Sequence, residues 1–257
     1  MSPQRGGAPE LTLEVETEDG VFLRLIRPAT ALASGREVGA AAEEATRSAA
    51  AIYGLPDFLF HPTQRSLGSG TREVGDAIVV VGDVAAAVQV KAREAPTGRE
   101  ERERAWLDRR ISKAARQAIG TIRTVTTVAT MLMNERGRRI EIDGSAKSWV
   151  PVVVVDHPDP PSGYSPSLSG SVPVVVLLRR DWEFLFEQLK STDAVIRYLH
   201  RVRRMPPVAL GEEPVRYYEL AAADTASPPR AHRRETATAR SISCLDPYPA
   251  SGASGGR

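Results

Sequence analysis

Cysteine is nearly absent from this chain: the only one is Cys244, in a segment rich in proline and serine. A single cysteine excludes an internal disulfide bond and any zinc site built from cysteines. No apolar run is long enough to span a bilayer, and the first residues, MSPQRGGAPE, contain no apolar signal core. We therefore expect a soluble, cytoplasmic protein without a membrane partner.

Several catalytic signatures are also missing. The four histidines are scattered without the spacing of metal ligands, and the sequence contains neither G-x-S-x-G nor H-E-x-x-H. The glycine-containing stretch 68–71 lacks the full phosphate-loop pattern. These absences leave no support for a serine hydrolase of the elbow type, a zinc protease or a phosphate-loop nucleotide site.

The length of the chain, 257 residues, is ample for one domain with a hydrophobic core. Helix-like and strand-like segments alternate, which favours the α/β or α+β class. We expect one domain over residues 10–220, with disordered segments at 1–9 and 221–257. The expected helices cover 35–53, 102–135, 181–189 and 191–203, and the expected strands 11–26 (a hairpin), 57–61, 71–93 (a hairpin), 138–142, 150–155 and 172–178.

The centre of the pattern is the stretch 71–93, TREVGDAIVVVGDVAAAVQVKAR, which predicts two apolar strands joined by a turn at residues 82–83. A two-residue turn there pairs residues whose numbers sum to 165, and so sets Asp76 opposite Gln89. Lys91 is two residues further on and points to the same face of the strand. A carboxylate, an amide and an ammonium group are thus expected together.

This combination suits phosphodiester hydrolysis, which needs a metal ion to activate water and a cation to offset charge on phosphorus. Mg²⁺ (or Mn²⁺) prefers oxygen ligands and keeps several waters. Asp76, Gln89 and the backbone carbonyl of Val90 are the candidate metal ligands. Lys91 is the candidate for orienting or deprotonating the water, so the catalytic set is Asp76, Gln89 and Lys91.

The order of these residues resembles the PD-(D/E)xK nuclease superfamily, with the restriction-endonuclease-like fold, in its QxK form. The resemblance rests on Gly75-Asp76, then Gln89-Val90-Lys91, followed by a long helix, and it covers residues 36–125. It implies a mixed central sheet flanked by helices and a DNA substrate. It also implies a metal-ligating Glu on the first helix, Glu43 or Glu44, a possible homodimer or larger defence system as partner, and a role in restriction, defence or repair.

The long helix adds a basic surface. Residues 91–139 hold thirteen Lys and Arg against six Asp and Glu, a net charge of +7 on a chain whose total is +2. An excess of positive charge beside the candidate site suits a polyanion. The candidate nucleic-acid-binding residues are Arg109, Lys113, Arg116, Gln117 and Arg123; in the resemblance, Trp106, Lys113 and Gln117 match a pattern of bacterial nuclease-like proteins.

Two alternatives stay open. Gln89 supplies no negative charge, which favours a catalytically inactive nucleic-acid-binding or scaffold domain on the same fold. An α/β interaction protein without a polar site is the third hypothesis, and it is preferred if Asp76 and Lys91 lie on opposite faces. Each residue also has an ordinary structural role available: Asp76 in a turn, Lys91 as a surface side chain, and the helix cations as a solvated face.

Overall fold

The computed structural model describes residues 11–17, 20–54, 56–62, 65–67, 70–72, 76–168 and 170–226. The predicted disordered segment 1–9 lies outside these ranges, as do residue 227 and all that follow it. Helix α5 (Glu213–Ala226) occupies the start of the predicted tail.

A mixed sheet of seven strands forms the centre of the fold, in the order β11-β10-β7-β6-β3-β8-β9. Strand β6 is antiparallel to both β3 and β7, whereas β10 runs parallel to β7 and β11. The predicted α/β (α+β) class with a mixed sheet flanked by helices is confirmed. The strands are β3 (Leu59–Pro62), β6 (Ala77–Val81), β7 (Val84–Ala92), β8 (Thr130–Asn134), β9 (Arg139–Ile142), β10 (Ser148–Asp156) and β11 (Val175–Leu178).

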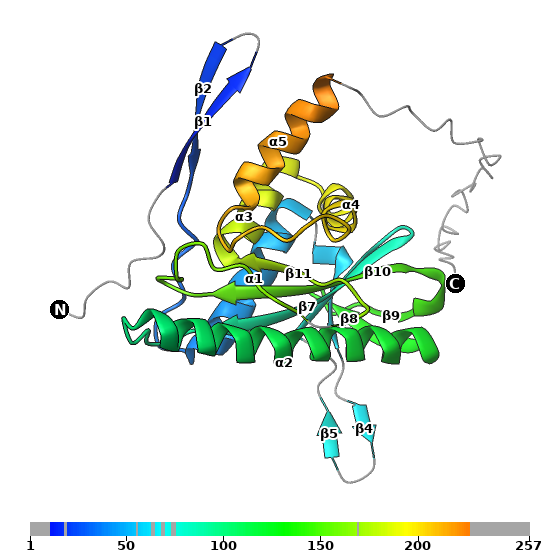
Figure 1. Cartoon of the computed structure of the whole chain (residues 1–257). Helices are drawn as coiled ribbons and strands as arrows, with labels where there is room; N and C mark the ends of the chain where they lie inside the picture. Colours follow the sequence, from blue (N-terminus) through cyan, green and yellow to red (C-terminus); the bar gives the residue numbers. More distant parts are fainter. Residues whose placement is uncertain are drawn as a thin grey trace, which may run out of the picture.

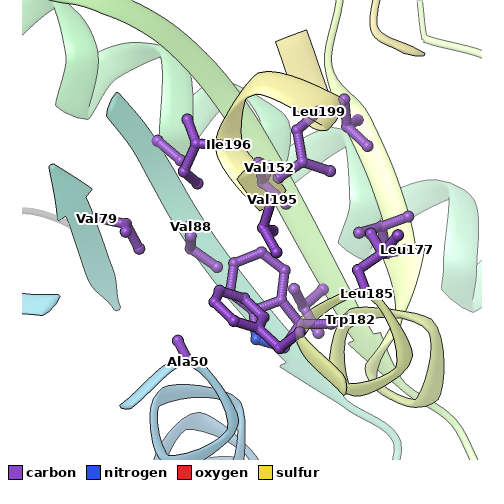
Figure 2. Packing of buried hydrophobic residues seen from close by; sticks show 14 of the residues in the cluster. Ala50, Val79, Val88, Val152, Leu177, Trp182, Leu185, Val195, Ile196 and Leu199 are labelled. Carbon is purple, nitrogen blue, oxygen red and sulfur yellow. The ribbon is translucent and has the colours of Figure 1, made fainter. Parts of the chain in front are cut away.

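One face of the sheet is covered by α1 (Val38–Gly54), α3 (Arg179–Leu189) and α4 (Thr192–Val202). Figure 2 shows the core that they enclose, in which Trp182 and Ile196 approach the strands. The indole nitrogen of Trp182 donates a hydrogen bond to the carbonyl oxygen of Thr46 at 2.9 Å, so α3 is fastened to α1 by a polar contact within the apolar layer.

The other face is covered by α2 (Glu100–Thr127), which crosses β7 and β10 (Figure 1). Strand β7 divides its side chains between the two layers. Ala86 and Val88 belong to the core under α1, α3 and α4, while Ala85 and Ala87 pack with residues of α2. Such alternation is the ordinary consequence of the strand period of two, and it decides which layer the polar residues of β7 face.

The N-terminal residues form the predicted hairpin, β1 (Leu11–Thr17) and β2 (Gly20–Ile26), with Leu11 paired to Ile26. The hairpin stands apart from the main sheet (Figure 1). Ile26 is buried in the core beneath it, whereas Leu23 on β2 is exposed. Among the helices in the described ranges, none is long and apolar enough to cross a membrane.

The long helix is shorter than predicted. It ends at Thr127, and residues 130–134 form strand β8 rather than continuing the helix to 135. The last turn contains the β-branched run Thr124-Val125-Thr126-Thr127, which has low helix propensity. Val128 then takes an extended conformation. The apolar periodicity continued across this boundary because the side chains of β8 are also partly buried.

Two further boundaries differ from the predictions. Residues 71–72, expected in the first strand of the central hairpin, instead belong to β5 (Gly70–Arg72), which pairs with β4 (Arg65–Leu67) in a small separate hairpin, and β6 starts at Ala77. Helix α1 starts at Val38, and the carboxylate of Glu37 accepts a hydrogen bond from the backbone N–H of Ala40 at 2.8 Å. Glu37 therefore satisfies an N-terminal donor of α1, which starts three residues later than predicted.

Candidate functional site

The candidate site lies where β6 begins and β7 continues beyond it. The two strands pair from Ala77 with Val88 to Val81 with Val84, so the predicted hairpin register is confirmed. Asp76 lies directly before β6, one residue beyond the last pair, Ala77 with Val88. Past Val88, β7 has no β6 partner, and its backbone groups on that side are open to side chains.

Asp76 and Lys91 meet in this opening. The Oδ2 atom of Asp76 accepts a hydrogen bond from the backbone N–H of Val90 at 2.6 Å. The Nζ atom of Lys91 lies 3.6 Å from the same oxygen and donates to the carbonyl oxygen of Val90 at 2.8 Å. The two charged groups therefore share one face, and the condition that would favour the third hypothesis is not met.

The site is partly open to solvent. The side chains of Asp76 and Lys91 are 16% and 19% exposed, whereas Gln89 is buried at 2%. Gln89 follows Ala85 and Ala87 in the alternation of β7, so it faces the layer of α2. Lys91, which is partly exposed, and the buried amide of Gln89 thus lie on one strand, and the partly exposed carboxylate of Asp76 is next to Lys91.

The oxygen atoms here are of the kind that Mg²⁺ prefers: a carboxylate of Asp76, the backbone carbonyl of Val90 and the amide oxygen of Gln89. Only one of them is anionic. Within the described part of the chain, no group of three or more His, Cys, Asp or Glu side chains is arranged to hold a metal ion. By the chemistry of its oxygens alone, this donor set suits a magnesium ion that keeps several of its waters.

The two candidate glutamates, Glu43 and Glu44, are on α1. Helix α1 packs on the face of the sheet opposite to α2. The carboxylate of Glu44 is 2.5 Å from a guanidinium nitrogen of Arg36, and Glu44 lines a cavity of about 390 Å³ between α1 and α3. Among the described residues no contact joins Glu44 to Asp76, and the role of Glu44 as a metal ligand stays a prediction. Glu43 is half-buried on α1, and its role as a metal ligand stays a prediction.

A buried polar network lies directly beyond Lys91. The carboxylate of Glu103 accepts two hydrogen bonds from Arg93, at 2.8 and 3.0 Å, and two from the backbone N–H and hydroxyl of Thr97, both at 2.7 Å. It also lies 3.1 Å from Nε2 of His157. Chiefly because Arg93 bonds to it, the pKa of Glu103 is held well below its ordinary value.

The tautomer of His157 follows from its two contacts. Its Nδ1 accepts a hydrogen bond from the backbone N–H of Asp159 at 3.2 Å, so Nε2 carries the proton and donates to Glu103. Burial lowers the pKa of His157, which keeps it neutral. The network joins the end of β7, the first turn of α2 and the end of β10. It therefore fixes the strand end that carries Lys91.

No local sequence pattern predicts this network. Arg93, Thr97, Glu103 and His157 are spread over more than sixty positions, and each is common on protein surfaces. The available signal was weak: a histidine directly after an unbroken apolar strand, and a glutamate in the first turn of an amphipathic helix.

The outer surface of α2 carries a row of cations. With 3.6 residues per turn, all but one of its exposed Arg and Lys side chains fall within an arc of about 80°. No side chain of this group makes a hydrogen bond or ion pair with another residue of the described ranges. The group, which we call the α2 cation row, comprises Arg102, Arg109, Lys113, Arg116 and Arg123, with Arg110 at its border.

The two borders of α2 face different parts of the sheet. Arg104 donates to the carbonyl oxygen of Ser162 at 2.9 Å, and Asp108 accepts from the hydroxyl of Tyr164 at 2.6 Å, both in the connection between β10 and β11. Arg110 and Gln117 are on the opposite border of the helix. Since the strand order is β11-β10-β7-β6, this border faces the side of the sheet that holds the candidate site.

No protein-family model, no curated protein and no solved structure matches the chain. The functional proposal therefore rests on the fold and the site alone.

Proposed function

We propose that the chain is a metal-dependent phosphodiesterase. The observation that carries the proposal is the convergence of Asp76, the backbone of Val90 and Lys91 at an open strand end, through contacts of 2.6, 2.8 and 3.6 Å. Oxygen donors for a hard cation and an adjacent ammonium group are what hydrolysis of a phosphodiester needs.

More particularly, we propose a DNA nuclease of the PD-(D/E)xK type, in its QxK form. The order of elements supports this: helix α1, strand β3, strand β6 with Asp76 at its start, strand β7 with Gln89 and Lys91 at its end, and helix α2. The α2 cation row supplies a surface for a polyanion on the face of the sheet that Gln89 shares. A homodimer or a larger defence assembly is a further part of the proposal, with restriction, defence or repair as the role.

Each residue has a distinct task in this proposal. Asp76, Gln89 and the carbonyl of Val90 hold Mg²⁺, which when bound lowers the pKa of a coordinated water. Lys91 places its ammonium beside the Asp76 carboxylate, where it offsets negative charge on the phosphate. Lys113, on the α2 cation row, holds the DNA backbone. The network around Glu103 keeps the strand end of Lys91 in place.

A second function is favoured by one observation: the site has a single carboxylate, and the described residues offer no cluster of three metal-ligating side chains. A domain with this donor set and the same cation row can bind nucleic acid without cleaving it. Such a protein binds DNA in a salt-dependent manner whether or not Mg²⁺ is present.

One experiment separates these functions. Plasmid, linear duplex and single-stranded DNA are incubated with the protein in Mg²⁺, Mn²⁺ or EDTA, together with Asp76→Asn, Lys91→Met and the control Glu141→Gln, an exposed carboxylate on β9. The nuclease proposal expects metal-dependent cleavage that Asp76→Asn and Lys91→Met abolish and Glu141→Gln preserves. Cleavage that survives both site variants refutes the site. Binding without cleavage by the wild-type protein selects the second function.

A further inference from the structure

Gly120 is an unusual residue for the interior of a long helix, where glycine is less favourable than alanine because it loses more backbone freedom. Gly120 is exposed, its backbone does not adopt a positive φ, and a Cβ built on it would meet no atom within 4 Å. Neither the backbone conformation nor the packing of the described residues therefore requires glycine at this position.

The position of Gly120 on the surface of α2 suggests a reason for the glycine. Gly120 lies within the arc that holds the α2 cation row. Arg116 precedes it by four residues and Arg123 follows it by three, so both are its neighbours on the helix surface. Both are exposed and make no ion pair with another described residue. Gly120 is thus a gap without a side chain between two cations that no described residue neutralises.

The chemistry of this surface indicates its occupant. Five arginine and lysine side chains in one row are complementary to a chain of phosphates. The aromatic residue of α2, Trp106, is buried at 8% exposure, so this helix offers no exposed ring on which an unpaired base can stack. The surface therefore suits the sugar–phosphate backbone of duplex DNA rather than unpaired bases.

We propose that the gap at Gly120 is the point where the backbone of bound DNA comes closest to α2, with Arg116 and Arg123 contacting phosphates on either side of it. The inference rests on the proposed nucleic-acid function and goes beyond it by assigning a role to Gly120. A side chain at position 120 holds the DNA backbone away from the helix and lengthens the contacts of both arginines. Because these contacts are to phosphate, they act on duplexes of any sequence.

The test compares Gly120→Ala and Gly120→Leu with the wild-type chain. Affinity is measured by fluorescence anisotropy on two duplexes of unrelated sequence and equal length, without metal, and stability by urea unfolding. Both variants are expected to unfold at a higher urea concentration than the wild type, because helix propensity rises and no atom is displaced. Both are expected to bind each duplex more weakly, by about fivefold for alanine and more for leucine, as contacts to phosphate are lengthened.

Two controls locate the effect. Ala222→Leu adds bulk to an exposed position of another helix, α5, which packs against α3, and is expected to leave the affinity nearly unchanged. Arg116→Ala removes one phosphate contact and is expected to reduce the salt dependence of binding by about one counterion. If Arg116→Ala weakens binding while both Gly120 variants bind like the wild type, the inference about Gly120 is wrong and the proposed function stands. If the wild type does not bind duplex DNA, the proposed function fails with it.

Discussion

Replacing Glu103 by glutamine tests the buried network beside Lys91 without depending on any function. The carboxylate of Glu103 is 4% exposed and receives hydrogen bonds from Arg93, Thr97 and His157. Glutamine has nearly the same shape, but it removes the negative charge and turns one acceptor into a donor. The guanidinium of Arg93, 19% exposed, then loses its counter-charge in a mostly buried place.

The size of the expected loss in free energy of unfolding follows from the burial of Glu103 and Arg93. Removing one partner of a buried ion pair costs about 3–5 kcal/mol, because the other charge stays desolvated and unpaired. A net hydrogen bond to a charged group is worth about 1.5–3 kcal/mol, and Glu103 accepts several. We therefore expect Glu103→Gln to lower the free energy of unfolding by about 3–5 kcal/mol, a large fraction of the stability of an ordinary domain.

The assay is urea unfolding followed by tryptophan fluorescence, since Trp106 packs against His157 with ring centroids 5.7 Å apart. Urea is preferred to guanidinium chloride because salt screens ion pairs. The matched control is Glu101→Gln, an exposed glutamate in the same helical turn, which should change stability by less than about 0.5 kcal/mol. Equal effects of the two variants would refute the network as a stabilising element.

The pH dependence gives a second check. The pKa of Glu103 is lowered in the folded state, so its contribution is fully present above its unfolded pKa of about 4.3 and is lost as pH falls through the folded pKa. The pKa of His157 is also lowered in the folded state, so the unfolded chain takes up that proton first. The free energy of unfolding therefore also falls as the pH drops below about 6.5 because of His157. The stability difference between wild type and Glu103→Gln should therefore shrink below about pH 5. A difference that grows on acidification contradicts the argument.

Three further predictions concern the scaffold. Gly144→Ala should lower the free energy of unfolding by about 1–3 kcal/mol in a urea titration, because the new Cβ overlaps the backbone carbonyl of Val125. Lys190→Gly should raise it by about 1 kcal/mol, because Lys190 ends α3 in the left-handed region at φ 49°. Burial raises the pKa of Asp181 to about 7. The stability that this raised pKa contributes is fully present below the unfolded pKa of about 3.9 and is lost as pH rises through 7. The change in the free energy of unfolding caused by Asp181→Asn should therefore be more positive at about pH 8 than at about pH 5. An equal change at both pH values would contradict this.

The central hairpin was predictable because local rules determine it. Apolar runs flank Gly82 and Asp83, so the turn between the two strands can lie only at these residues. A two-residue turn then fixes which residues of the two strands pair. That register sets Asp76 near Gln89 and Lys91 on their face, and the structure confirms the contact of Asp76 with Lys91. The class of fold was predictable for a related reason, since residues 150–155 as an unbroken apolar run require cover on both faces of a sheet.

Other features depend on contacts between distant parts of the chain. The end of α2 at Thr127 is decided by the pairing of residues 130–134 with β3 and β9, which periodicity alone does not show. The ion pair of Glu44 with Arg36 is likewise set by how the chain folds before α1. The network of Glu103 joins residues from three elements. Sequence patterns within one element give only a weak signal for these features, such as the β-branched run at the end of α2.

The unequal lengths of β6 and β7 explain why the site lies where it does. Strand β6 has five residues and β7 has nine. Beyond Val88, β7 keeps its parallel partner β10, with Val90 beside Val154, but it has no β6 residue on its other side. One side of the strand end is therefore held by the sheet and fixed further by the network of Glu103. The other side presents the N–H and carbonyl of Val90, which Asp76 and Lys91 occupy. A strand end that is held by the sheet on one side therefore places the backbone oxygen of Val90 and the ammonium group of Lys91 beside the carboxylate of Asp76, which directly precedes β6.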